Sequence, residues 1–437
     1  MNSKFKFFLV VCLAVTFTDS KAQNARHEQV ADTIEIGCKQ FATNKLPGKV
    51  SVDKDLGIAT LPWVEGQVIH KSLVDSNQFI MESHATITPK GDYLLMFPLG
   101  LHMAASAEKV NDLISYRSKD KGKTWEGPKV AFDIDYSQIG FISFIPKGSN
   151  RIYAFGCQPI KELRRMDQGQ RENVPIGYRY SDDDGYTWSE VHLIHPTNDP
   201  DYIGICAMRM CETNKGTWIL GTHEGDWSYQ PLITRQYFLR SEDHGKTWQL
   251  GPDVRHKGWF LPCYGRMDEG RPITTSDGGV MFLFRTPEGH YWASRSKDDG
   301  KTWTEPAATT LVQPDAPPML FHLTDGKTMI AIHHNRSTIQ TADLGGNMKQ
   351  HMDRSEIWFS LSSDDGKTWS EPRFIFANAL APTLKNIWFS VNCSYIDCFA
   401  DNGTLHLFVP HRWSRALHLT ISESDLGKFP TKEDLLK

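Results

Sequence analysis

An eight-residue pattern, Ser-x-Asp-x-Gly-x-Thr-Trp, occurs five times and constrains the fold more than any other feature of the chain. The copies span 118–125, 181–188, 241–248, 296–303 and 362–369, so successive copies begin 63, 60, 55 and 66 residues apart. Ser and Asp side chains bond nearby backbone N–H groups, Gly accepts a positive φ, and Trp offers a large apolar surface. We therefore expect each copy to close a β-hairpin and to place its Trp between neighbouring sheets.

A second pattern lies upstream of most copies and consists of two apolar segments joined by a two-residue turn signal. The turn signals are Gly91-Asp92, Asp277-Gly278, Asp325-Gly326 and Asn402-Gly403, and such pairs between apolar runs predict hairpins. Each unit then has about four strands, and the units begin near residues 80, 138, 202, 266, 317 and 391. The repeat predicts an all-β chain that forms a six-bladed β-propeller of four-stranded antiparallel blades. Seven blades are the alternative if residues 25–75 form one.

The N-terminal 22 residues have the pattern of a secretory signal. Basic residues precede an apolar stretch over 7–17, and Ser20-Lys21-Ala22 places small residues at positions −3 and −1. That stretch is too short to span a bilayer, and no later stretch reaches the roughly 18 apolar residues that a membrane helix needs. We predict a signal peptide over 1–22 and a single propeller domain over 23–437. The mature protein is expected to be secreted or periplasmic, with no integral membrane segment.

The balance of charges argues against nucleic acid as a partner. The chain has 48 Lys and Arg against 52 Asp and Glu, a net charge of −4, and no long run of either sign. A chain organised around nucleic acid would show a basic excess.

The cysteines leave several arrangements open. Seven follow the signal, and an odd number excludes a complete disulfide framework. Cys206 and Cys211, like Cys393 and Cys398, are five residues apart, a spacing compatible with local bridges, with metal thiolates or with buried free cysteines. No cofactor is expected, and a structural metal ion stays an open alternative.

With its five repeats and its hairpin signals, the chain resembles the sialidase-like propellers that carry Asp-box (BNR) repeats. The resemblance extends from about Gln78 to Asp425 and includes three further segments, Ser83-His84-Ala85, Glu269-Gly270-Arg271 and His334-Asn335-Arg336. It implies a site at the central axis, where the innermost strand of each blade begins. The same scaffold carries hydrolases, lyases and binding proteins, so the residues of the site must decide the function.

Sialidases hold the substrate carboxylate with three arginines and use a tyrosine nucleophile activated by a glutamate, and the resemblance transfers part of this set. Glu269 stands where the activating carboxylate is expected, and Tyr395 stands at the position of the nucleophile. Bidentate guanidinium groups suit a planar carboxylate, so Arg266, Arg285 and Arg336 are the predicted anion clamp.

The first blade departs from the sialidase pattern. Sialidases normally have Arg-Ile-Pro there, followed by an acid/base Asp, whereas this chain has His84 and His102 on either side of one hairpin. Histidine titrates near neutrality and can serve as an acid or a base. Propeller enzymes that act on rhamnose–glucuronate linkages, and ulvan-type lyases, are similar in having His on the first blade and Tyr and Arg on the second, for which Tyr153 and Arg165 are the candidates here. His334 ends a predicted strand and is a candidate for the central site.

Three functions fit these residues. The first is an exported exo-acting glycoside hydrolase that removes a terminal sugar, sialic acid or a uronate-linked rhamnose, from an acidic glycan or polysaccharide. The second is a polysaccharide lyase that cleaves at a uronate by β-elimination. The third is a glycan-binding propeller without activity. A lyase releases an unsaturated uronate that absorbs in the ultraviolet, which separates it from a hydrolase.

Overall fold

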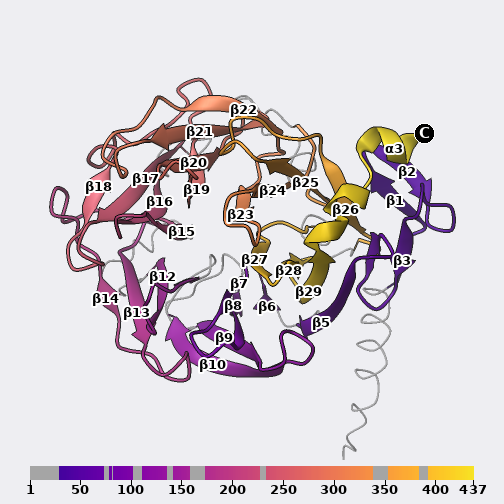
Figure 1. The fold of residues 1–437 in the computed structure, drawn as a ribbon, viewed down its shortest axis with the longest axis horizontal. Coiled ribbons are helices and arrows are strands. Elements are labelled where there is room, and N and C mark those ends of the chain that lie inside the picture. Colours follow the sequence, from indigo (N-terminus) through magenta and orange to yellow (C-terminus); the bar gives the residue numbers. More distant parts are fainter. Residues whose placement is uncertain are drawn as a thin grey trace, which may run out of the picture.

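A computed structural model shows an all-β chain whose sheets are arranged radially around one axis (Figure 1). It describes residues 29–72, 78–80, 82–101, 111–134, 141–157, 173–226, 233–337, 353–382 and 392–437. Six antiparallel sheets form the ring, and each contains four strands of one blade in order from the axis outward. The six-bladed propeller predicted from the repeat is confirmed.

The first three blades follow one another in sequence. Their strands are β7 (His84–Ile87), β8 (Tyr93–Leu101), β9 (Asn111–Ser118) and β10 (Glu126–Ile134) in blade one, with β6 (Gln78–Phe79) pairing to β8; β11 (Ile142–Phe144), β12 (Ile152–Cys157), β13 (Ile176–Ser181) and β14 (His192–Leu193) in blade two; and β15 (Cys206–Glu212), β16 (Trp218–Asp226), β17 (Ile233–Ser241) and β18 (Gln249–Gly251) in blade three.

The last three blades continue the ring and take in the N-terminal strands. Their strands are β19 (Asp268–Thr274), β20 (Val280–Arg285), β21 (His290–Ser296) and β22 (Ala307–Val312) in blade four; β23 (Met319–His322), β24 (Met329–His333), β25 (Glu356–Ser362) and β26 (Arg373–Asn378) in blade five, extended by β4 (Ile58–Thr60) and β3 (Ser51–Asp53); and β27 (Asp397–Asp401), β28 (Thr404–His411), β29 (Arg415–Ser422) and β5 (Glu65–Lys71) in blade six.

Each Asp box forms the turn between the third and fourth strands of its blade. In the first copy, Gly122 N–H donates to Ser118 Oγ at 2.8 Å, and Thr124 N–H donates to Asp120 Oδ1 at 2.8 Å. Gly122 has φ +85°, the left-handed conformation that the turn requires. The box tryptophans pack between blades as expected: the Trp125 ring lies 5.8 Å from that of Phe408 in blade six.

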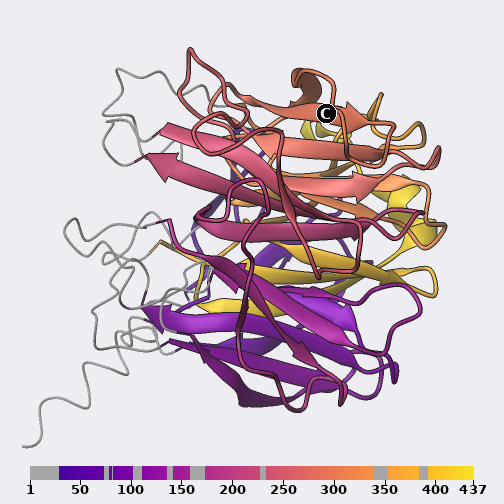
Figure 2. The same cartoon turned by 90° about the vertical axis from the view of Figure 1, so that its left-hand side faces the viewer.

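The alternation of strands gives the propeller two distinct faces (Figure 2). The inner strands β7, β11, β15, β19, β23 and β27 all begin at one face, here called the start face, and end at the other. The third strand of a blade runs parallel to the inner strand and leads into the Asp box, so the boxes lie on the second face, here called the box face. The box residue Asp184 contacts the first hairpin turn of blade one there, through Thr88 Oγ1 at 2.9 Å.

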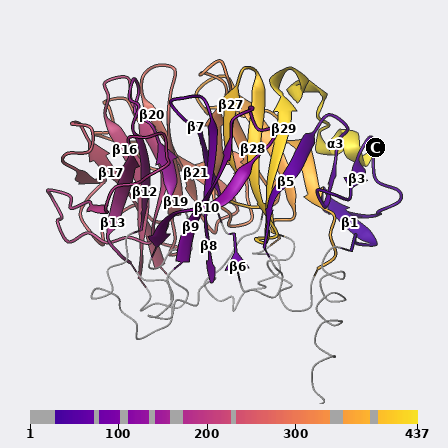
Figure 3. The ribbon, with the colours of Figure 1, turned by 90° about the horizontal axis from the view of Figure 1, so that it is seen from below.

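The N-terminal segment closes the ring and adds no blade. Strand β5 lies beside β29 as the outermost strand of blade six (Figure 3). In this pairing Val68 is opposite Leu417. Strands β3 and β4 extend blade five, and β1 (Thr33–Ile36) and β2 (Lys39–Ala42) form a separate hairpin. The seven-blade alternative built on residues 25–75 is therefore wrong, because these strands complete existing sheets.

Two short helices follow the last blade, and the cysteines among the described residues form no bridges. A 3₁₀-helix, η3 (Glu423–Lys428), and a short helix, α3 (Lys432–Leu436), follow the last strand. None of the helices in the described part of the chain is long and apolar enough to cross a membrane. The seven cysteines after residue 22 are all free thiols, so neither five-residue pair forms a local bridge. Residues 1–22, predicted to be the signal peptide, lie outside the described residues.

Candidate active site

A tyrosine and a glutamate from different blades meet at the start face. Tyr395 Oη donates a hydrogen bond to Glu269 Oε1 at 2.7 Å, and both residues are buried. Glu269 belongs to the inner strand of blade four, and Tyr395 lies two residues before the inner strand of blade six. The two residues that the resemblance singled out as nucleophile and activating carboxylate are thus in direct contact.

The side chain of Glu269 is directed by an irregularity in β19. The register with β20 shifts between Asp268 and Arg271, which marks a β-bulge, and Glu269 has φ +48°. A bulge redirects side chains near sites, and a left-handed non-glycine residue is a strained conformation that the surroundings must hold. Gly270 allows this path, because a Cβ there would lie 2.5 Å from the ring of Phe282.

Tyr395 is held by a turn just before β27. Asn392 Oδ1 accepts hydrogen bonds from Ser394 N–H at 2.9 Å and from Ser394 Oγ at 2.6 Å, and Tyr395 then adopts φ +64°. An Asn side chain that mimics a backbone turn in this way fixes the chain direction locally. The Tyr395 ring packs near Trp413, with centroids 6.5 Å apart.

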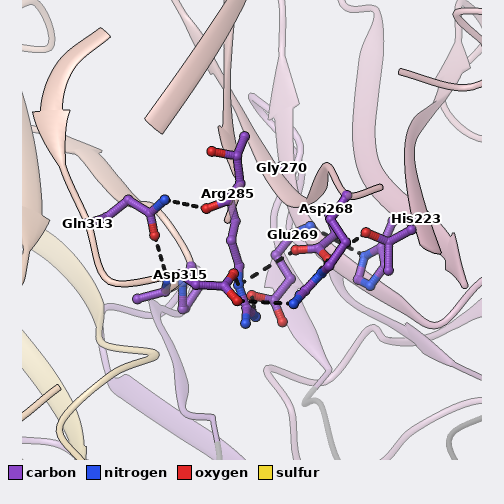
Figure 4. A network of polar contacts seen from close by, with 12 residues as sticks. His223, Asp268, Glu269, Gly270, Arg285, Gln313 and Asp315 are labelled. Carbon is purple, nitrogen blue, oxygen red and sulfur yellow. Dashed lines mark hydrogen bonds and ion pairs between the residues drawn. The ribbon is translucent and has the colours of Figure 1, made fainter. Parts of the chain in front are cut away.

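Arg285 links Glu269 to a buried network of acids (Figure 4). Its Nη1 donates to Glu269 Oε2 at 2.7 Å, and its Nε donates to Asp315 Oδ1 at 2.7 Å. Arg266 binds the same network, through Asp315 Oδ2 at 3.0 Å and Asp268 Oδ2 at 2.9 Å. Two of the three predicted clamp arginines therefore lie beside the Tyr395–Glu269 pair.

The charge of Glu269 is set by Arg285. Burial alone would raise the pKa of the Glu269 carboxyl, but the adjacent guanidinium outweighs this effect and holds the pKa below its usual range. Glu269 is therefore ionised near neutral pH. An ionised carboxylate that already accepts the phenol proton in a hydrogen bond can take that proton when the tyrosine oxygen attacks.

A third arginine, Arg354, reaches the same place. It lies two residues before β25 and is buried, with Nη1 donating to Ser394 Oγ at 3.2 Å and Nη2 donating to the Asp315 carbonyl oxygen at 2.6 Å. Arg285 and Arg354 both donate to Asp315, and burial together with the positive charge of Arg285 lowers the pKa of Arg354. Within the described part of the cluster, Arg354 binds neutral oxygens while the other two arginines bind carboxylates.

Sequence reasoning did not find Arg354, although a signal for it exists. The third strand of each blade runs from the start face to the box, and Arg354 precedes the box residue Ser362 by the length of that strand. A cation placed eight residues before a box serine is thus expected at the start face.

His84 forms part of a second charged layer on the axis. Its Nε2 lies 3.3 Å from Glu82 Oε1, and its Nδ1 lies 3.7 Å from Asp397 Oδ2. Arg271 approaches Glu82 at 3.4 Å, and Arg209 binds Asp397 at 2.6 Å. Burial would lower the pKa of His84, but the two carboxylates outweigh it and the pKa lies above its usual value. The protonated, positive form of His84 is thus favoured beneath the Tyr395–Glu269 pair.

Arg336, the third arginine of the predicted clamp, has partners other than the Tyr395–Glu269 pair. Arg336 binds Glu35 at 2.6 Å and Glu356 at 3.0 Å, and so ties β1 to blade five. The predicted clamp of Arg266, Arg285 and Arg336 is therefore not formed as one cluster, because Arg336 follows β24 toward the N-terminal hairpin.

His334 contacts a backbone carbonyl, and Tyr153 packs among aromatic side chains. His334 Nδ1 lies 3.0 Å from the Glu356 carbonyl oxygen, and burial lowers its pKa to about 3, so it is neutral. Tyr153 pairs with Tyr180, next to an Asp box, and its ring lies 5.2 Å from Trp218. That position is at the box end of blade two, between blades, and not at the start of an inner strand. His102 and Arg165 lie outside the described residues.

Metal binding has no support in this part of the chain. Within the described ranges, no group of three or more His, Cys, Asp or Glu side chains is arranged to hold a metal ion. Cys206, which the sequence left open as a thiolate ligand, has its Sγ 3.2 Å from His223 Nδ1. Burial raises the pKa of Cys206 and lowers that of His223, so both are neutral.

Comparison with known proteins gives a consistent result. Residues 162–428 match the model of the BNR repeat-like domain. A sialidase of Micromonospora viridifaciens is 23% identical over 318 residues, which are 65% of this chain and 44% of that protein. A sialidase of Bacteroides fragilis is 26% identical over 239 residues, 46% of this chain and 38% of that protein. The chain thus spans less than half the length of these relatives.

Solved structures show the same architecture. The Hadza microbial sialidase Hz136 superposes with a TM-score of 0.59 at 17% identity, over 84% of this chain and 69% of that one. At this identity the likeness concerns the fold, and the function has to be argued from the site.

Proposed function

Because the chain belongs to the BNR repeat-like family, we propose that it is an exo-acting glycoside hydrolase of the sialidase type that removes a terminal sugar from an acidic glycan. One observation carries the proposal: a buried tyrosine hydroxyl donates to an ionised glutamate, with two arginines beside the pair. The relatives named sialidases support the same reaction class.

The proposed reaction begins with Tyr395 as nucleophile. Its Oη forms a bond to the anomeric carbon while the glycosidic C–O bond breaks, and Glu269 receives the phenol proton. The departing oxygen takes a proton from an acid, the role predicted for His102. Water then attacks the anomeric carbon and gives one proton to the base left by the first step, the role proposed for deprotonated His102, which restores the acid. The Tyr395–carbon bond breaks, and the proton on Glu269 returns to the phenol oxygen.

Arg354 and Arg285 are proposed to bind the carboxylate of the substrate. Arg354 is suited to this because its guanidinium holds neutral oxygens, so its charge is available to an anion. Arg285 also sets the pKa of Glu269, and Arg266 is proposed to hold Asp268 and Asp315 in place. His84 is proposed to orient the site by its charge, since both ring nitrogens face carboxylates.

The terminal sugar is proposed to carry a carboxylate, with sialic acid as the first candidate. A rhamnose linked to a uronate is the second candidate, in which the carboxylate belongs to the sugar next to the cleaved linkage, because Ser83-His84-Ala85 stands where sialidases have Arg-Ile-Pro. Export to the periplasm or medium is proposed from the N-terminal 22 residues and agrees with a glycan substrate.

The test uses three glycan types, namely sialosides, rhamnose-capped glucuronans and sulfated rhamno-uronans. Released monosaccharide is measured by chromatography, and ultraviolet absorbance reports unsaturated uronate. Released sugar without absorbance, lost in Tyr395→Phe, supports the hydrolase and identifies its substrate. Rising absorbance would instead indicate a lyase and exclude the proposal. Saturable binding without product would leave a glycan-binding propeller.

A further inference from the structure

A second concave site lies on the axis, away from the Tyr395–Glu269 pair. It is a cavity of about 390 Å³ whose walls come from the inner strands of blades one, two, three and six. Its outer lining includes Ile87, Phe144 and Phe399, which are half-buried, and the exposed Pro89. These residues lie toward the ends of inner strands, so the cavity faces the box face of the propeller.

The charged layer around His84 forms the floor of this cavity. His84, Asp397 and Arg209 line it, whereas Glu269, Tyr395, Arg285 and Arg354 do not. Along β27, Tyr395 precedes Asp397, and Phe399 follows it. The floor therefore lies between the two sites, and a ligand in the cavity would approach it from the side opposite to the Tyr395–Glu269 pair.

Arg209 is the charge on the floor that a ligand can reach. Its side chain is 30% exposed, against 3% for His84 and 5% for Asp397. Both Asp397 oxygens are occupied by protein donors, Oδ1 by Arg209 and Oδ2 by Ala85 N–H at 2.9 Å. A guanidinium has five N–H donors, and the bond to Asp397 leaves others for a ligand.

The floor of the cavity favours an anion. Arg209 and Asp397 balance each other, and Arg271 lies against Glu82. Burial opposes a charge on His84, but its carboxylate neighbours outweigh burial and raise its pKa, which favours the protonated form. One reachable guanidinium in a cavity with isoleucine and phenylalanine walls suits a monoanion with an apolar face better than a small, strongly hydrated dianion.

We propose that this cavity is a binding site for a small carboxylate that has an apolar ring face, with the carboxylate on Arg209 and the ring between Phe144 and Phe399. The site is separate from the proposed hydrolytic site and does not depend on the reaction assigned to it. A uronic acid and an aryl carboxylate share this chemistry.

Binding is tested on the purified chain by isothermal titration with glucuronate and benzoate, and with glucose and benzyl alcohol as uncharged counterparts. We expect at least one acid to bind at least about tenfold more tightly than its counterpart, because a charge-assisted bond to Arg209 is lost without the carboxylate. The acid that binds more tightly than its uncharged counterpart identifies the class of the ligand.

Three variants locate the ligand. Ser143→Trp places a large ring in the cavity from its half-buried wall, leaves the Arg209 and Asp397 side chains unsubstituted, and should abolish binding. Arg209→Gln should weaken binding about tenfold. Arg295→Gln, which changes a half-buried arginine outside the cavity, is the matched control and should bind normally. Circular dichroism confirms that each variant is folded.

The opposite pattern would overturn the proposal. If neither acid binds more tightly than its neutral counterpart, the cavity does not recognise a carboxylate. If binding survives Ser143→Trp and is lost in Arg354→Gln, the ligand occupies the Tyr395–Glu269 site. Hydrolysis is measured in a separate assay. A failure of carboxylate binding in the cavity therefore does not affect the proposed hydrolase function, and an absence of hydrolysis does not affect the proposed binding site.

Discussion

The hydroxyl of Tyr395 lies 2.7 Å from Glu269 Oε1, although 126 residues separate the two in the chain. Both residues have left-handed backbones, with φ of +64° and +48°. Such strain persists only where the surroundings impose it, and it concentrates at functional sites. The contact therefore depends on two blades holding strained residues at a fixed separation, which a propeller with a closed ring can provide.

Replacing Tyr395 by Phe should lower kcat by roughly 10²–10⁴-fold, because the nucleophile is removed while the ring is kept. Stability should change little, since Glu269 keeps its bond to Arg285. The measurement is kcat on the released-sugar substrate, together with thermal unfolding. Tyr237→Phe is the matched control, because Tyr237 is also buried and donates to a glutamate, Glu224, at 3.0 Å. Equal loss of activity in both variants would show that the effect is structural.

Arg354→Lys and Arg336→Lys should separate substrate binding from structure. A lysine cannot reproduce bidentate binding of a carboxylate, so Arg354→Lys should raise KM and lower kcat/KM at least about tenfold. Arg336→Lys should leave kcat/KM unchanged and lower stability, because Arg336 joins Glu35 to Glu356. Steady-state kinetics on both variants is the measurement. A larger kinetic effect of Arg336→Lys would restore the clamp predicted from the sequence.

The fold could be predicted from the sequence because its strongest signal is local. Ser118, Asp120 and Gly122 build their own turn from bonds within five residues. Five such turns at near-regular spacing mark five blades, and the hairpin signal at Asn402-Gly403 adds the sixth. The closure of the ring by the N-terminal strand β5 has no comparable local signal in the sequence. Val68 pairs with Leu417 from the other end of the chain, and the apolar pattern of a strand does not identify a partner so distant. Residues 25–75 could therefore be mistaken for a separate blade.

The site was predictable where side chains sit at the start of inner strands. Glu269 and Tyr395 occupy such positions, and a resemblance in motif was enough to pair them. Arg336 is predicted as the third clamp arginine and Arg354 is not, yet Arg336 binds Glu35 and Glu356 near the N-terminal hairpin. Contacts with distant acids decide where a long side chain goes, and a single sequence does not reveal them.

His84→Gln should lower the free energy of unfolding most at low pH. The carboxylates of Glu82 and Asp397 raise the pKa of His84 in the folded protein above its value of 6.5 in the unfolded chain. The stabilisation is therefore complete below pH 6.5 and is lost as the pH rises through the folded pKa. We expect a loss of about 1–3 kcal/mol at pH 5.5, smaller at pH 9, by chemical denaturation.

The control for this pH dependence is His256→Gln, which removes an exposed histidine 3.4 Å from Glu224. The His256 side chain is 74% exposed, so solvent screens its charge, and the stability of this variant should match the wild type at both pH values. A loss in His84→Gln that stays constant from pH 5.5 to 9 would show that packing, and not the charge of His84, stabilises this layer.

The stacked pair His406 and His418 should make the junction of blades six and one sensitive to acid. Their rings lie 5.2 Å apart, and His406 Nδ1 is 2.9 Å from His418 Nε2. Burial lowers the pKa of His406 to about 4 and that of His418 to about 3. Between pH 6.5 and pH 4 the unfolded chain therefore binds protons that the folded chain does not, and stability falls as the pH falls.

Replacing His418 by Phe keeps the ring stacked on Phe408, whose centroid lies 4.9 Å away, and removes one titrating group. The free energy of unfolding should then fall less steeply between pH 6.5 and pH 5, by up to about 1.4 kcal/mol per pH unit. Chemical denaturation across this range is the measurement. His192→Phe, at an exposed histidine stacked on Tyr178, is the control. An unchanged slope in His418→Phe would mean that His418 takes up no extra proton on unfolding in this range, and would contradict the acid sensitivity assigned to this pair.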